Sequence, residues 1–171
     1  MRVAVTGTPG TGKTSAVEAL ETDLTRIHLN DVIRREGLTT DYDEDRDSAV
    51  ADLDAVAEYL DGREDVLFES HLAHEFDADR VVVLRCHPEQ LERRLADRDE
   101  SAESAESVAE NAESEALDLI LSEAVRRHGE DSVYEIDTTD RSPAEVARAI
   151  ESVIAGTREP AAGTVSFVEY L

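Results

Sequence analysis

One segment near the start of this 171-residue chain limits its possible folds more than any other feature. Residues 7–14 read GTPGTGKT, which matches the pattern G-x-x-x-x-G-K-[ST]. The segment follows a short apolar run at residues 3–6 and precedes an amphipathic stretch from Thr14 to about Glu21. Glycines between a strand and a helix allow backbone N–H groups to surround an anion, and the start of the helix adds partial positive charge. The segment therefore predicts a nucleotide phosphate site.

The residue types within this loop predict separate roles. Gly10 and Gly12 let the backbone curl around the phosphates, Lys13 is expected to reach the β- and γ-phosphates of ATP, and the Thr14 hydroxyl is expected to ligate Mg²⁺. The alternative is a glycine turn that binds no ligand. The position of the loop between a predicted strand and a predicted helix favours the phosphate site over that alternative.

The charge balance of the chain is strongly acidic. Asp and Glu number 41 against 17 Lys and Arg, for a formal net charge of −24, and Lys13 is the only lysine. Such a composition resembles that of proteins from salt-loving archaea, because salt screens the repulsion between like charges. An acidic ligand-binding face is the alternative explanation. A nucleic-acid-binding surface is disfavoured because it needs a basic footprint, so we expect no direct nucleic-acid patch.

Short apolar runs alternate with amphipathic stretches along the chain, which predicts the α/β class. We expect a P-loop NTPase with three α/β/α layers and a five-stranded parallel sheet. The predicted strands are residues 3–6, 24–29, 65–68, 81–86 and 133–136. The predicted helices are residues 14–21, 30–35 (capped by Asn30 and ended by Gly37), 48–60, a helix opened by Pro88, a helix with Leu117, Ile120, Leu121 and Val125 facing inward, and 143–155. Residues 39–47 are predicted to be an acidic loop.

The domain organisation is expected to be simple. Residues 1–156 form the predicted kinase-like domain, and residues 157–171 form a tail that either docks on the domain or is a disordered end. No apolar run approaches the roughly 18 residues that span a bilayer, so we expect a soluble, cytoplasmic protein without a membrane partner. The single cysteine, Cys86, is interpreted as core filler rather than a reactive thiol.

Further candidate site residues stand where predicted strands and helices end. Glu69 follows the strand at residues 65–68 and is predicted to hold Mg²⁺ or its water, while His71 could orient or activate a water molecule. A surface carboxylate and a structural histidine are the alternatives. His71 and His74 could also suggest a metal site, although the sequence offers no third ligand. Arg98 is predicted to be a lid arginine, and Arg34 is expected in a region that holds an acceptor phosphate; for each, a solvated surface arginine is the alternative.

Taken together, the chain resembles the adenylate kinase isoenzyme-6 family, whose members are linked to late maturation of the small ribosomal subunit and its rRNA. The resemblance covers roughly residues 1 to 150. The matching residues are 7–15, Asn30-Asp31 with Arg34, Tyr42-Asp43-Glu44 with Asp52, Glu69-Ser70-His71, residues 82–85, residues 92–95 and Arg98. The acid-x-His sequence and the Tyr-Asp-Glu segment are what distinguish this family from ordinary adenylate kinases.

The resemblance implies a broad nucleoside monophosphate kinase, ATP plus AMP giving two ADP, that is also a Mg²⁺-dependent ATPase. It also implies transient binding to platform protein eleven of the small ribosomal subunit, released by ATP turnover. The site residues that it implies are an ATP loop (Gly10, Gly12, Lys13, Thr14, Ser15), an acceptor region near residues 28–51 with Asp31 and Arg34, a lid near residues 97–107 with Arg98, and His71 positioning the attacking water. Glu69 departs from the aspartate that many family members have.

Three functions remain open at this level. The chain could be a metabolic nucleoside monophosphate kinase, an assembly factor whose ATPase cycle gates a ribosomal protein, or a kinase of another small metabolite such as a shikimate-like acid.

Overall fold

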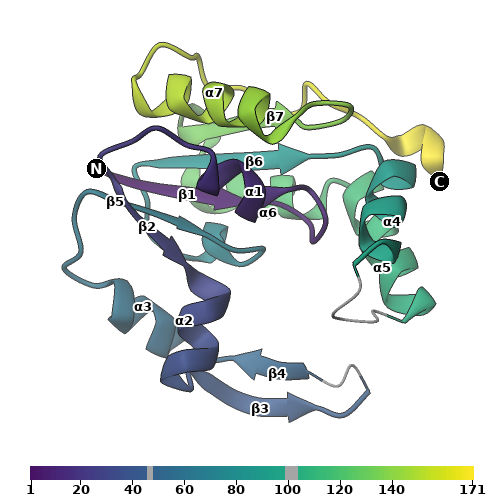
Figure 1. Ribbon diagram of the computed structural model, residues 1–171, viewed down its shortest axis with the longest axis horizontal. Coiled ribbons are helices and arrows are strands. Elements are labelled where there is room, and N and C mark those ends of the chain that lie inside the picture. The colour runs from purple at the N-terminus through teal and green to yellow at the C-terminus, as the bar shows by residue number, and fades with distance from the viewer. Residues whose placement is uncertain (46–47, 99–103) are drawn as a thin grey trace.

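Five parallel strands form the central sheet of the computed structural model, which describes residues 1–45, 48–98 and 104–171 (Figure 1). Their spatial order is β2-β5-β1-β6-β7, so the chain builds outward on both sides of the first strand. The strands are β1 (Arg2–Thr6), β2 (Thr25–His28), β5 (Val66–Glu69), β6 (Arg80–Arg85) and β7 (Val133–Asp137). All the predicted strands are present within one or two residues, and the P-loop α/β/α fold class is confirmed.

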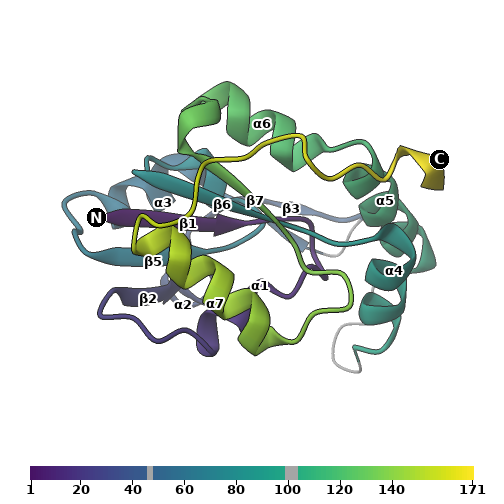
Figure 2. The ribbon, with the colours of Figure 1, turned by 90° about the horizontal axis from the view of Figure 1, so that it is seen from above.

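Helices cover both faces of this sheet because side chains of a strand alternate between its faces. Val3 and Val5 of β1 pack toward α1 (Lys13–Glu18) and α7 (Pro143–Ile154), whereas Ala4 packs toward α2 (Leu29–Glu36), α3 (Leu53–Leu60) and α6 (Leu119–His128). Figure 2 shows α6 on one side of the sheet and α1 with α7 on the other. The four strands β5, β1, β6 and β7 are buried on both faces, as expected of a parallel sheet, whereas the edge strand β2 exposes Thr25 and Arg26.

The other elements lie beside the sheet rather than over it. The helices α4 (Pro88–Ala96) and α5 (Ala105–Ala116) pack together beyond the carboxyl ends of the strands, around a small apolar cluster that includes Cys86 (Figure 1). Cys86 is fully buried, as predicted for core filler. Three short 3-10 helices complete the described structure: η1 (Ala73–Glu75), η2 (Glu130–Ser132) and η3 (Val168–Tyr170).

The predicted acidic loop is wrong at residues 39–43, and so is the predicted start of a helix at residue 48; residues 46–47 of that loop lie outside the described residues. In their place stands an antiparallel hairpin, β3 (Thr39–Asp43) and β4 (Ser48–Ala51), which lies below α2 in Figure 1. The next helix begins at Leu53, because the Asp52 side chain accepts a hydrogen bond from the Ala55 N–H and caps it. Val50, which lies within the predicted helix 48–60, is therefore an exposed strand residue.

Two further expectations about helices need correction. Asn30 does not cap α2; His28 occupies the cap position, and the Asn30 side chain instead accepts a hydrogen bond of 2.8 Å from Ser70 Oγ. Leu117 does not face inward but is exposed, because Asp118 adopts a left-handed conformation that separates α5 from α6 and resets the helical period. Residues 105–114, which are mostly Ala, Glu and Ser, form most of α5.

The tail at residues 157–171 docks on the domain. Ala161 pairs with Tyr134 beside β7, where the Glu135 N–H donates to the Ala161 carbonyl at 2.8 Å. Further along, the Phe167 ring packs edge-on against the His87 ring, and the Tyr170 hydroxyl donates to Glu92 at 2.8 Å. The tail therefore runs from the outer strand to α4, as Figure 2 shows.

Within the described parts of the chain, no helix has both the length and the apolar character needed to cross a membrane.

Candidate active site

The predicted phosphate loop connects β1 to α1 at the carboxyl edge of the sheet, where open α/β sheets bind their ligands. Gly10 and Gly12 have φ angles of 93° and 91°, a region that residues with a Cβ atom rarely adopt. α1 begins without a side-chain cap, so its first N–H groups have no side-chain partner. The loop therefore offers backbone donors at the place where the sequence predicts phosphates.

Lys13 is buried beneath this loop. Its Nζ donates hydrogen bonds to the carbonyl oxygens of Gly7 and Thr8, at 2.8 and 3.1 Å. Burial lowers the pKa of Lys13 to about 8; Glu69 opposes this shift, and the charge of Arg98 adds to it. The lysine is thus held by backbone carbonyls, and no carboxylate among the described residues forms an ion pair with it, so an arriving anion would stabilise its charge.

Glu69 stands at the end of β5, which lies next to β1 in the sheet. Its Oε1 accepts a hydrogen bond of 3.2 Å from Thr14 Oγ1 and lies 2.8 Å from Nδ1 of His28 at the end of β2. Magnesium prefers oxygen ligands and is commonly held by a carboxylate and a hydroxyl beside phosphates. The Thr14 hydroxyl and the Glu69 carboxylate therefore lie side by side, an oxygen pair that fits the predicted Mg²⁺ site.

His71 lies in the turn that follows β5, close enough to Lys13 for the two to interact electrostatically. Burial, together with electrostatic repulsion from Lys13 and His74, lowers the pKa of His71 to about 4. His71 is therefore neutral near pH 7. A neutral imidazole has a lone pair that can accept a proton or a hydrogen bond from water.

A cavity of about 290 Å³ lies on the outer side of the loop, a size close to that of small-molecule sites. Arg98 contributes to it, and so does Ser15 of the predicted ATP loop. The complete lining is Gly10, Thr11, Gly12, Ser15, Arg94, Arg98, Thr138, Arg141, Pro143 and Val146. Arg98 is exposed at the rim, and most of the predicted lid that follows it, residues 99–103, lies outside the described residues.

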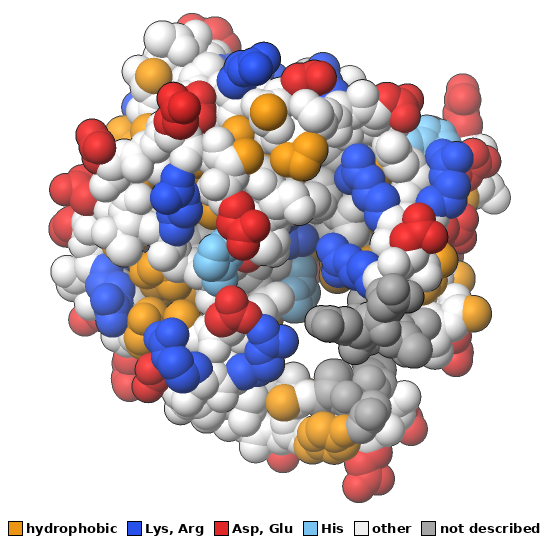
Figure 3. Space-filling model, viewed as in Figure 1, with side chains coloured by type: hydrophobic (Ala, Val, Ile, Leu, Met, Phe, Trp, Pro, Cys, Tyr) orange, Lys and Arg blue, Asp and Glu red, His pale blue; other side chains and the backbone are white. Residues whose placement is uncertain are grey.

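The predicted acceptor residues are not brought to the loop by any contact in the described structure. Asp31 and Arg34 pair with each other on the exposed side of α2, where both side chains are more than half exposed. On the face drawn in Figure 3, the surface is hollowed between the part that carries the hairpin and the part that carries α4, and basic and histidine side chains gather around the hollow. α2 and the hairpin thus lie on one side of this hollow.

Several residues in the site were missed by the sequence reasoning. Arg94 donates to the Gly10 carbonyl at 3.3 Å and to the Thr138 carbonyl at 3.2 Å, and Thr138 Oγ1 donates to the Thr11 carbonyl at 3.0 Å. In the sequence, the one indication of their role is that they follow two strands, β6 and β7, whose carboxyl ends lie at the same sheet edge as the loop. His28 was missed because its role depends on β2 lying beside β5.

The histidine pair proposed as an alternative metal site does not form. Among the described residues, the group that could hold a metal combines His74 with Glu75 and Glu123, without His71. His74 lies with both ring nitrogens near partners, Thr6 Oγ1 at 2.8 Å and Glu123 Oε2 at 3.0 Å. Those contacts account for it as a structural histidine.

Comparisons with known proteins find relatives that match the whole chain. A protein-family profile described as an AAA domain matches residues 3–118. A protein of Natronomonas pharaonis, named "Putative adenylate kinase", is 66% identical over 171 residues and covers 100% of both chains. A protein of Halobacterium salinarum with the same name is 62% identical over 172 residues, again with 100% of each chain covered.

Solved structures also resemble the chain. A shikimate kinase from Acinetobacter baumannii, in complex with shikimate, matches with a TM-score of 0.62 and 18% identity, over 92% of this chain and 94% of that one. At that identity the likeness shows the fold alone.

Proposed function

The chain belongs to the archaeal adenylate kinase family of these relatives and contains an AAA domain, and from this premise we propose that it is a Mg²⁺-dependent nucleoside monophosphate kinase. The reaction is ATP plus AMP giving two ADP, with tolerance for other monophosphates. The observation that carries the proposal is the meeting of Lys13, Thr14 and Glu69 at the glycine loop, since it joins a phosphate cation to an oxygen pair suited to Mg²⁺.

In this proposal the loop N–H groups of Gly10, Gly12 and Ser15 bind the phosphates of ATP. Lys13 moves its Nζ from the carbonyls of Gly7 and Thr8 to the β- and γ-phosphates, where its charge is better satisfied. Phosphoryl transfer depends mainly on positioning and on neutralising charge, and a buried ammonium does both.

Thr14 and Glu69 would hold Mg²⁺, the second partly through water. The ion supplies further charge neutralisation at the β- and γ-phosphate oxygens. His28 holds the carboxylate from its other side through the 2.8 Å contact to Oε1, which fixes its orientation beside Thr14. Glu69 is one methylene longer than aspartate, so this support matters more than it would for the shorter side chain.

Arg98 is proposed to contact the γ-phosphate as it moves from ATP to the acceptor. It lines the same cavity as Gly10 and Ser15 and lies near enough to Lys13 to influence its pKa. Residues 97–107 would form the lid that carries it. On the opposite side, residues 28–51 would bind the monophosphate, with Asp31 and Arg34 reaching the acceptor once it enters the hollow.

A coupled assay of ADP formation at high salt tests the proposal, with ATP and each of AMP, CMP, GMP, UMP and shikimate as acceptor. We expect ADP formation with AMP, and none with Lys13→Ala. Arg34→Ala should raise the KM for AMP. Arg35→Ala is the matched control, since Arg35 is also an exposed arginine of α2 but pairs with Glu36. Transfer to shikimate alone would contradict the assignment and favour a metabolite kinase.

A second activity, ATP hydrolysis, is favoured by His71. A neutral imidazole near Lys13 is suited to position a water molecule against the γ-phosphate when no acceptor is bound. Such hydrolysis would fit an assembly factor that binds platform protein eleven of the small ribosomal subunit and releases it on ATP turnover, with the acidic surface attracting a basic partner. Pull-down of that protein with and without ATP tests this role, and failure to bind in either state would contradict it.

A further inference from the structure

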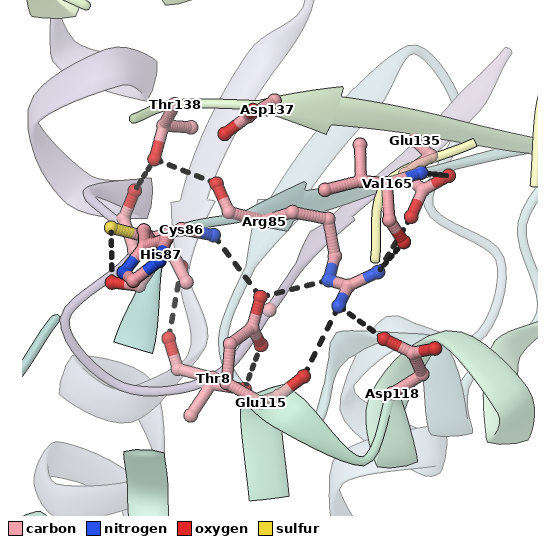
Figure 4. Close-up of polar contacts among 12 residues, drawn as sticks. Thr8, Arg85, Cys86, His87, Glu115, Asp118, Glu135, Asp137, Thr138 and Val165 are labelled. Carbon is pink, nitrogen blue, oxygen red and sulfur yellow. Dashed lines mark hydrogen bonds and ion pairs between the residues drawn. The ribbon is translucent and has the colours of Figure 1, made fainter. Parts of the chain in front are cut away.

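A buried ionic cluster lies directly behind the phosphate loop. Its centre is Arg85, the last residue of β6, which is 1% exposed. Three carboxylates surround the guanidinium: Glu115 from α5, Asp118 from the junction that follows it, and Glu135 from β7 (Figure 4). A single charge facing three buried or half-buried carboxylates is costly unless the carboxylates have other donors.

Glu115 has those other donors, and one of them is in the loop. Its Oε1 accepts from Arg85 Nε at 2.8 Å and from the Cys86 N–H at 3.1 Å. Its Oε2 accepts a hydrogen bond of 2.6 Å from Thr8 Oγ1. Both Glu115 and Thr8 are almost fully buried, so water does not compete for this hydrogen bond.

Thr8 in turn holds the parts of the loop that face the phosphates. Its carbonyl accepts from Lys13 Nζ at 3.1 Å, from the Thr11 N–H at 3.2 Å and from Thr11 Oγ1 at 2.9 Å. The side chain of Thr8 is thus tied to the cluster while its backbone is tied to the loop. A shift of Thr8 would move the lysine and the turn at Thr11 together.

Glu135 anchors the cluster from the opposite side. Its Oε1 lies 2.5 Å from Arg85 Nη1, and its Oε2 accepts from the N–H and the hydroxyl of Thr164 at 2.7 and 2.8 Å. The tail therefore closes over the cluster, and the Phe167 ring lies 5.4 Å from the Arg85 guanidinium carbon. The Arg85 guanidinium is thus held by Glu115 on one side and by Glu135 and the tail on the other.

From this geometry we propose that Glu115 is a positioning residue of the phosphate loop, which acts through Thr8 and sets the loop in the conformation that binds ATP. The proposal rests on the proposed function only in that the loop binds ATP. A carboxylate fixed by Arg85 and by a backbone N–H presents its second oxygen at a defined point. Charge-assisted hydrogen bonds of this kind are short and strong, and the loop is held before the nucleotide arrives.

Removing the Glu115 carboxylate is a poor test, since it would leave the Nε of Arg85 and the Cys86 N–H without their buried acceptor and destabilise the fold. Thr8→Val is better, because it removes only the donor and keeps the shape of the side chain. Thr164→Val is the matched control: it removes one hydroxyl that donates to a carboxylate of the same cluster, at 2.8 Å, but on the side away from the loop.

The test measures the Kd for Mg²⁺-ATP by calorimetry at high salt, together with thermal unfolding of the free proteins. We expect Thr8→Val to weaken ATP binding by about tenfold, the factor that corresponds to loss of one hydrogen bond to a charged group. Thr8→Ser, which keeps the hydroxyl, should restore binding, and Thr164→Val should bind like the wild type even if its Tm falls.

Each other outcome is informative. Wild-type affinity in Thr8→Val, or equal loss in Thr8→Ser, would overturn the positioning role. Equal weakening in Thr164→Val would overturn it too, because the effect would then follow the stability of the cluster rather than the loop contact. Absence of ATP binding by the wild type would instead contradict the proposed function.

Discussion

The affinity for ATP should depend on pH through Lys13. Burial lowers the pKa of this residue to about 8 in the free protein, from an ordinary value of 10.5. At about pH 7 the ammonium is then about 90% charged, and at about pH 9 only about 10% charged. The phosphates of ATP favour the charged form, so binding should return the pKa at least to its ordinary value.

The difference in the charged fraction of Lys13 between the two pH values gives the expected change in ATP affinity. The Kd for ATP should rise about tenfold between about pH 7 and pH 9, which is about 1.4 kcal/mol of binding free energy. Binding should also take up about 0.1 proton at the lower pH and about 0.9 at the higher. Calorimetry in two buffers of different ionisation enthalpy measures both quantities at once.

The lone lysine makes the control simple. Lys13→Arg keeps a positive charge that does not titrate in this range, so its Kd should not change with pH, whatever its absolute value. The buried Cys86 thiol and the N-terminal amine also have raised pKa values. Both groups are present in the wild type and in the variant, so they do not account for a difference between the two proteins. A pH-independent Kd and no proton uptake in the wild type would show that burial does not lower the pKa of Lys13 in the free protein.

Three other predictions concern the same site. His71→Ala should lower ATP hydrolysis at least about tenfold while changing transfer to AMP less, as measured by phosphate and ADP release; equal losses would show that His71 does not act on water. Because the pKa of His71 falls from 6.5 to about 4 on folding, stability should fall as pH drops through that range, and His71→Asn should flatten the denaturant midpoint against pH; an unchanged profile would contradict this. Gly10→Ala should weaken ATP binding about tenfold, since its φ is 93° and the new Cβ would lie 3.0 Å from Leu95 Cγ, whereas Gly62→Ala, with a φ of 71° and open space, should bind normally.

The sequence predicted the sheet and the phosphate loop well because both depend on local signals. Residues 81–84 form a continuous apolar run, and the GTPGTGKT loop lies between a strand and a helix, as its pattern requires. The helix of residues 143–155 was equally clear: Ser142 accepts from the Glu145 N–H as a capping residue, and Pro143 occupies the first turn.

The hairpin was not predicted because its strands carry little apolar periodicity. Thr39–Asp43 is exposed at four of five positions, so alternation was hidden by acidic residues. The periodicity through Val50 and Leu53 suggested a helix that in fact starts later. Asp52 was the signal that could have corrected this, since aspartate three residues before Ala55 is suited to cap a helix start.

The candidate site was predicted only as far as strand ends could indicate it. Glu69 ends β5, and the loop that leads to Lys13 follows the neighbouring strand β1; a parallel sheet brings these two strand ends together. The contact of Thr8 with Glu115 joins residues 107 positions apart and depends on how α5 packs behind the loop. The low-complexity sequence of that helix gave no indication that one of its many glutamates is buried.

Transfer of the γ-phosphoryl group is the central claim, and labelled ATP tests it most directly. With ATP labelled at the γ-phosphate and AMP as acceptor, at high salt, we expect most of the label in ADP and a minor share in inorganic phosphate. The label should stay in ATP when Lys13→Ala replaces the wild type. Label found only as inorganic phosphate, however much AMP is added, would contradict the kinase assignment and leave an ATPase.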